Sequence, residues 1–225
     1  MFYAVLSLII LNAIVLGYGA AYKKIIFLNS NEKVQNIDCI YGFFLLITLS
    51  IFLNFFFPLK FFSHTVAIVG LLFFLYFLYK KKFEINFLSL ITISIFFVFI
   101  SKNNSLLYDS RLYHLQTIQF TSNFPIILGI ANLEPRYGMN SSWHSFLSLI
   151  NLEILSLKYI YLGNLTLTCF FFKEIFKKNF LLDKKISHIF LFITIFYICI
   201  YSFLHPSANG TIFASLSSPE VDYVA

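Results

Sequence analysis

Residues 2–22 read FYAVLSLIILNAIVLGYGAAY, a run that contains no charged side chain. A helix of about 20 predominantly apolar residues is long enough to cross the hydrocarbon core of a bilayer. No basic residue precedes the run, and it is longer than the apolar part of a secretory signal peptide, so we expect a membrane helix rather than a cleaved leader. Further apolar runs follow at residues 39–57, 61–79, 87–100, 159–176 and 186–204.

The composition of the whole chain agrees with a protein built from such runs. Its 225 residues are 59% hydrophobic and only 12% charged, and the mean hydropathy is +0.82. A soluble domain usually carries about 25% charged residues. The three cysteines, Cys39, Cys169 and Cys199, lie within or beside apolar runs and form no C-x-x-C pair. These features exclude a soluble enzyme, a disordered protein and a disulfide scaffold.

The runs predict an all-α fold, a polytopic transmembrane bundle of about six helices in four parts. Residues 1–100 hold four N-terminal crossings, 101–158 a polar extracytoplasmic loop, 159–204 two further crossings, and 205–225 an extracytoplasmic tail. The stretch 143–176 is too long for one crossing and short for two, and Glu153 and Lys158 interrupt its first half. We therefore expect residues 142–157 to form an amphipathic helix at the membrane interface, with Trp143 in the aromatic belt.

The positive charges indicate the orientation of these crossings. If the N-terminus is outside, eleven lysines fall in the inner loops, and only Lys60, Lys102, Arg111 and Arg136 fall in the outer ones. This is the bias that the positive-inside rule expects. The net charge of +6 is therefore attributed to orientation and not to nucleic-acid binding. The apolar runs have almost no charge at their centres, which argues against a proton-coupled or ion-coupled transporter.

The polar loop contains the side chains that are suited to catalysis or ligand binding. The first of them lie in YDSRLYHLQ at residues 108–116. In a helix, Asp109, Tyr113 and Gln116 would share one face, and Arg111 and His114 another. A carboxylate at the membrane surface can act as a general base or hold a divalent metal. An arginine can bind a phosphate through two hydrogen bonds. The segment therefore suits chemistry on a phosphate-linked substrate.

The second half of the loop reads NLEPRYGMNSSWH at residues 132–144 and adds Arg136 and Asn140. A simpler interpretation is that Asp109 pairs with Arg111 or Arg136 and only orders an exposed loop, because surface ion pairs are common. The histidines, including His144, are scattered without an H-x-x-x-H pattern, so Asp109 is the one metal ligand that we name. The sequence alone leaves both interpretations open.

Three stretches of the sequence resemble a known family. The patterns Y-D-x-x-x-Y-H-x-Q at 108–116 and N-L-x-x-R-Y-G-x-N-S-S-W at 132–143 resemble an uncharacterised family of bacterial polytopic membrane proteins, typically encoded near surface-polysaccharide genes. The stretch S-S-P-x-x-D at 217–222 resembles the same family. In architecture this family is similar to glycosyltransferases of the C-type membrane fold. Those enzymes use polyprenyl-phosphate sugars and carry an essential acidic residue in an early extracytoplasmic loop.

The resemblance implies a multi-pass protein of the bacterial inner membrane that transfers a sugar from a lipid-linked donor to a glycan acceptor. Its partners would be membrane lipids, the donor and the acceptor, with no nucleic acid and with a divalent cation as an optional cofactor. Asp109 matches the acidic catalytic position. The candidate ligands of phosphate or acceptor are Arg111, His114, Arg136, Tyr113, Gln116 and Asn140. Family members are usually much longer, so the chain is expected to be an N-terminal fragment.

Two other functions compete with sugar transfer. One is a transport or flippase component for a lipid-linked glycan. The other is a non-catalytic membrane subunit, or an inactive remnant, whose loop serves only assembly. Replacing Asp109 with asparagine would spare transport or assembly but abolish transfer, and so it separates these functions.

Overall fold

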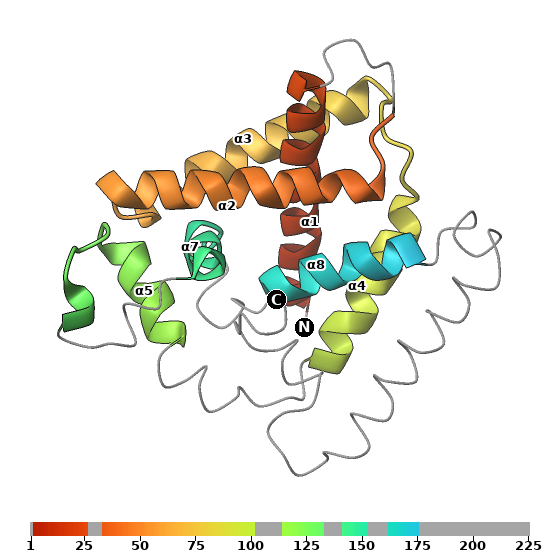
Figure 1. The fold of residues 1–225 in the computed structure, drawn as a ribbon. Helices are drawn as coiled ribbons and strands as arrows, with labels where there is room; N and C mark the ends of the chain where they lie inside the picture. Colours follow the sequence, from red (N-terminus) through yellow and green to blue (C-terminus); the bar gives the residue numbers. More distant parts are fainter. Residues whose placement is uncertain (1, 27–32, 102–113, 133–140, 153–161, 176–225) are drawn as a thin grey trace.

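A computed structural model describes residues 2–26, 33–101, 114–132, 141–152 and 162–175, which are entirely helical apart from turns and one isolated β-bridge (Figure 1). This confirms the expected all-helical class. The α-helices are α1 (Phe2–Ile26), α2 (Cys39–Phe56), α3 (Lys60–Tyr79), α4 (Phe87–Ser101), α5 (Leu115–Asn123), α7 (Ser142–Leu149) and α8 (Leu162–Ile175). Two short 3₁₀ turns, η1 (Asn36–Asp38) and η3 (Ile130–Asn132), complete the described elements.

Three of these helices are long and apolar enough to cross a membrane: α1, α2 together with η1, and α3. This makes the chain a membrane protein by length and composition, although the described residues hold three such helices and not the expected six. At about 1.5 Å per residue, the described parts of α4 (15 residues) and α8 (14 residues) are by themselves shorter than a hydrocarbon core about 30 Å thick, and both adjoin residues outside the described ranges. The run at 186–204 lies outside the described residues.

Helix α1 packs between α2 and α3, and glycines make both contacts (Figure 1). Gly17 and Gly19 are two positions apart, about 200° around the helix, so they face opposite sides. A Cβ added to Gly17 would collide with the backbone of Gly70 in α3, and one added to Gly19 would collide with the carbonyl of Asp38 just before α2. Membrane helices commonly use such small residues to bring their backbones close together.

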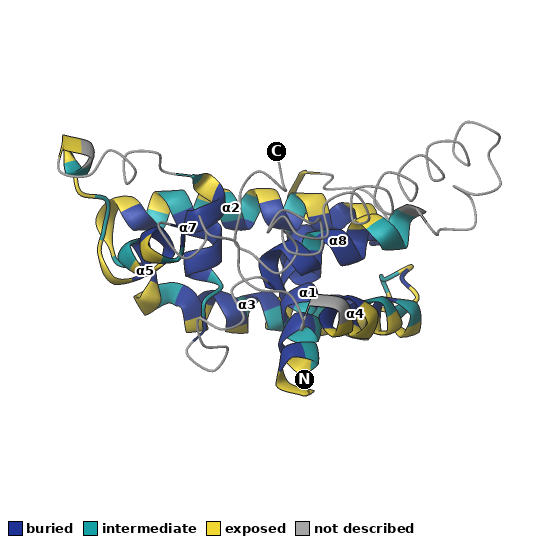
Figure 2. Ribbon diagram, turned by 90° about the horizontal axis from the view of Figure 1, so that it is seen from below, coloured by how far each residue is buried: buried dark blue, intermediate teal, exposed yellow. Residues whose placement is uncertain are grey.

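Burial divides the helices into a protein-facing centre and an apolar exterior. Most of α1 is buried, whereas α2, α3 and α4 carry rows of exposed residues (Figure 2). The large exposed apolar side chains on α2 and α3 include Phe44, Phe52, Phe55, Phe56, Phe61, Ile68, Leu72 and Leu75. An apolar surface this continuous would be unfavourable in water and is what a lipid-facing helix presents.

The connections at one end of these helices are tied together. The main-chain N–H of Val34 donates to the Lys82 carbonyl at 2.6 Å, and the N–H of Glu84 donates to the Val34 carbonyl at 2.8 Å. The carboxylate of Asp38, which is 2% exposed as a residue, accepts hydrogen bonds from Lys23 Nζ at 3.0 Å and from the Gln35 N–H at 2.8 Å. The segment before α2 is therefore fixed to the turn that follows α3.

Candidate functional site

Helix α5 is attached to the C-terminal end of α2 through one buried amide. Asn54 Nδ2 donates to the carbonyl oxygens of Thr121 at 3.0 Å and Phe124 at 3.1 Å. In return, the main-chain N–H of Ile126 donates to the Asn54 carbonyl at 2.8 Å. Asn54 is one of the few polar residues inside the apolar runs. Its role is to satisfy the backbone at the end of α5, where the helix has carbonyls without helical partners.

Helix α7 lies inside the protein and packs against α2 and α5. Ser141 caps it by accepting the Trp143 N–H at 3.2 Å, and every residue from Trp143 to Leu149 is buried. Ser148 Oγ donates to the Ile118 carbonyl of α5 at 2.9 Å and also contacts the Thr121 hydroxyl. This helix differs from the expected interfacial helix over 142–157 because its polar side chains find partners within the protein.

The indole of Trp143 is part of the core and not of an aromatic belt at the membrane surface. It is 4% exposed and packs against the rings of Phe43, at a centroid distance of 6.0 Å, and Phe146, at 4.8 Å. Its Nε1–H donates to Asn164 Oδ1 in α8 at 2.9 Å. Buried tryptophans usually find such a partner, and Asn164 supplies it from within an apolar run.

A pair of histidines joins the two halves of the polar segment. His114 Nδ1 and His144 Nε2 are 2.8 Å apart, and the ring centroids are 4.8 Å apart. Both residues are buried, with exposures of 8% and 3%. At this distance one ring nitrogen donates its proton to the lone pair of the other. The motif that ends near residue 116 and the motif that ends near residue 144 therefore meet at this hydrogen bond.

The structure describes two of the seven predicted site residues. His114 is buried against α7, and Gln116 is exposed on the first turn of α5, so the two side chains lie on different faces, as expected from their spacing. The other five, Asp109, Arg111, Tyr113, Arg136 and Asn140, lie outside the described residues. Ile118 of α5 is fully buried.

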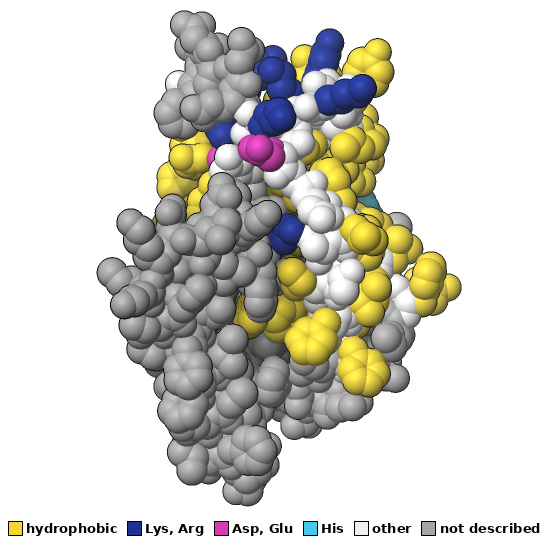
Figure 3. Space-filling model, turned by 90° about the vertical axis from the view of Figure 1, so that its right-hand side faces the viewer, with side chains coloured by type: hydrophobic (Ala, Val, Ile, Leu, Met, Phe, Trp, Pro, Cys, Tyr) yellow, Lys and Arg dark blue, Asp and Glu magenta, His cyan; other side chains and the backbone are white. Residues whose placement is uncertain are grey.

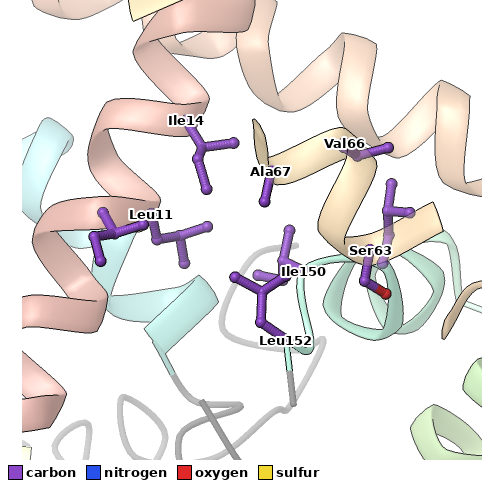
Figure 4. Close-up of a pocket in the computed structure, with 9 residues that line it drawn as sticks. Leu11, Ile14, Ser63, Val66, Ala67, Ile150 and Leu152 are labelled. Atoms are coloured by element: carbon purple, nitrogen blue, oxygen red, sulfur yellow. The ribbon is translucent and has the colours of Figure 1, made fainter. Parts of the chain in front are cut away.

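The described residues contain no cluster of metal ligands, and two small hollows lie among them. No group of three or more His, Cys, Asp or Glu side chains comes together there. A hollow beside α5 is lined by Asn54, Thr117 and Thr121 together with apolar side chains. A second, almost wholly apolar hollow lies between α1, α3 and the residues after α7 (Figure 4). Its lining includes Leu11, Ile14, Ser63, Val66, Ala67, Ile150 and Leu152.

His144 is not among the site residues predicted from the sequence, although it directly follows the second motif. The available signal was the group of polar residues His144, Ser145 and Ser148 inside an otherwise apolar stretch. On a helix these positions cannot all face lipid without leaving polar groups unsatisfied. That signal indicates a buried helix with polar partners, although it does not identify the partners.

These features define a helical membrane protein in which α7, from the polar segment, is packed against α2 and α5, and α5 is bound to the end of α2 through Asn54. The chain belongs to the family described as Domain of unknown function (DUF8201), which matches residues 1–223. No curated protein and no solved structure matches it.

Proposed function

We propose that the protein is a membrane glycosyltransferase of the C-type kind, which transfers a sugar from a polyprenyl-phosphate donor to a cell-surface glycan acceptor. The observation that carries this proposal is the hydrogen bond between His114 and His144. It joins the segment that follows Asp109 and Arg111 in the chain to the segment that follows Arg136 and Asn140. Contacts of Asn54 and Trp143 fix both segments to neighbouring helices.

In the proposed reaction Asp109 takes the proton from an acceptor hydroxyl as its oxygen attacks the anomeric carbon of the donor sugar. The bond between that carbon and the phosphate oxygen breaks, and polyprenyl phosphate leaves with the bonding electrons. Arg111 and Arg136 hold the phosphate, since guanidinium groups bind it through paired hydrogen bonds. Tyr113, Gln116 and Asn140 supply hydrogen bonds to the acceptor.

The proposed topology has six crossings in the bacterial inner membrane, with both termini outside. A cysteine introduced by Ser110→Cys should react with an impermeant thiol reagent in spheroplasts, because residue 110 belongs to the outer loop. A cysteine introduced by Lys81→Cys should react only after the membrane is permeabilised. The native Cys39 and Cys169 are buried, and Cys199, outside the described residues, is first replaced by serine so that it adds no background. The reverse labelling pattern would place Asp109 inside and contradict transfer at the outer face.

The decisive experiment compares glycan profiles of a deletion strain rescued with the wild-type gene or with Asp109→Asn. We expect the wild type to restore the surface glycan and Asp109→Asn to restore less than about 1% of it, since removal of a general base typically costs 10²–10⁴-fold in rate. Asp183→Asn, in a predicted inner loop, is the matched control and should rescue fully. Equal rescue by wild type and Asp109→Asn, at equal protein levels, would favour transport or assembly over transfer.

A further inference from the structure

Lysines gather where α1 and α3 end, on the face shown in Figure 3. We call Lys24, Lys33, Lys80, Lys81 and Lys82 the lysine collar. The hydrogen bonds between Val34 and the 82–84 segment bring the α1–α2 connection beside the α3–α4 turn, so lysines from both connections share one surface. Lys24, Lys33, Lys80 and Lys81 are exposed, and Lys82 is half-buried.

Nearby carboxylates do not neutralise the lysine collar. In the described residues at this end, Asp38 is bound by Lys23, which is not a collar member, and Glu84 accepts a hydrogen bond from Gln35 Nε2 at 3.3 Å. Among the described residues, these two carboxylates and Glu174, at the nearby end of α8, stand against seven lysines when Lys23 and Lys173 are counted. The surface therefore carries a net positive charge, which attracts anions over about one Debye length, near 8–10 Å.

Exposed aromatic and aliphatic side chains adjoin the lysine collar. The ring of Tyr76 lies 5.6 Å from Lys24 Nζ and 6.0 Å from Lys80 Nζ, and the ring of Tyr79 lies 5.9 Å from Lys80 Nζ. Tyr79 is 82% exposed, and Ile25, in the last turn of α1, is 66% exposed. Cations directly beside exposed apolar groups are typical of the boundary between lipid tails and headgroups.

We propose that the lysine collar binds the headgroup of an anionic phospholipid. Lysine ammonium groups would donate hydrogen bonds to the phosphodiester, while Ile25, Tyr76 and Tyr79 would contact the upper part of the acyl chains. A phospholipid fits better than a soluble anion or a nucleic acid because only the lipid uses both the charge and the adjoining apolar surface. This inference is independent of the proposed sugar transfer.

The lipid site is tested by native mass spectrometry of the full chain, released from bilayers of equal phosphatidylglycerol and phosphatidylcholine. We expect the wild type to retain phosphatidylglycerol selectively. The variant K80Q/K81Q/K82Q should bind it at least about tenfold more weakly, since each lysine near an anionic surface contributes about fivefold. The variant K80R/K81R/K82R keeps the charge and should bind phosphatidylglycerol like the wild type.

Lys60→Gln is the matched control, because Lys60 is exposed at the opposite end of α3. It should leave lipid retention unchanged, and all variants should melt within a few degrees of the wild type. Equal retention of both lipids by the wild type would overturn the proposal. So would an equal loss in Lys60→Gln, or displacement of the lipid by millimolar inorganic phosphate, which would indicate a general anion site.

Discussion

Replacing Gly17 with alanine is expected to destabilise the protein by about 3 kcal/mol, at the upper end of what overpacking usually costs. The added methyl group would collide with the main-chain oxygen of Gly70 and lie 2.9 Å from the main-chain nitrogen of Phe74. Neither atom can move unless the whole of α3 shifts. The same argument applies to Gly42, where a methyl group would meet the Val15 carbonyl. The double variant G17A/G42A should fail to assemble.

The matched control is Gly163→Ala in α8. A methyl group there would meet the Leu147 Cδ2 atom, the far end of a flexible side chain, so the neighbour can rotate away. Alanine also favours a helix over glycine by up to about 1 kcal/mol. The control should therefore stay within about 1 kcal/mol of the wild type, measured as unfolding in SDS titrations from mild detergent. Equal losses in Gly17→Ala and Gly163→Ala would contradict the close contact between α1 and α3.

The apolar runs predicted the first helices well, because a membrane span is set by hydropathy along a single segment. Helix α3 ends at Tyr79 as expected, immediately before three lysines, and α2 begins at Cys39 as expected. Helix α1 continues past Tyr22 to Ile26, and Lys23 in this last part of the helix binds Asp38. The number of full-length spans was harder to predict, since the described parts of α4 and α8 are short.

The site was harder to predict, because its contacts join residues that are distant in the sequence. Asn54 and Asn164 are polar residues within apolar runs, but hydropathy does not indicate that they bind the backbone of α5 and the indole of Trp143. The position of Trp143 beside a polar loop suggested an aromatic belt. Packing against Phe43 instead places its ring in the core. Residue type thus indicated which side chains needed partners, and only the fold identified them.

Replacing His144 with alanine should cost about 3 kcal/mol of stability. The substitution leaves a cavity beside α7 and removes the hydrogen bond to His114. The loss of buried contacts and the loss of a buried hydrogen bond can each cost a few kcal/mol. His114→Ala should have a similar effect. Because both single variants break the same bond, the double variant should be less destabilised than their sum, by about 1–2 kcal/mol. SDS unfolding of the four proteins measures this coupling.

His64 provides the control for these substitutions, because it is an exposed histidine on α3. His64→Ala should change stability by no more than about 0.5 kcal/mol. In the glycan assay, His144→Ala should lower rescue although Asp109 is intact, because the two motif segments would lose the hydrogen bond that joins their ends. His144→Gln should recover part of both losses, since its side-chain amide can still bond to the facing imidazole. If the losses of stability in the two single variants simply add up in the double variant, the two rings do not act as a pair. The proposed site would then lose its main support.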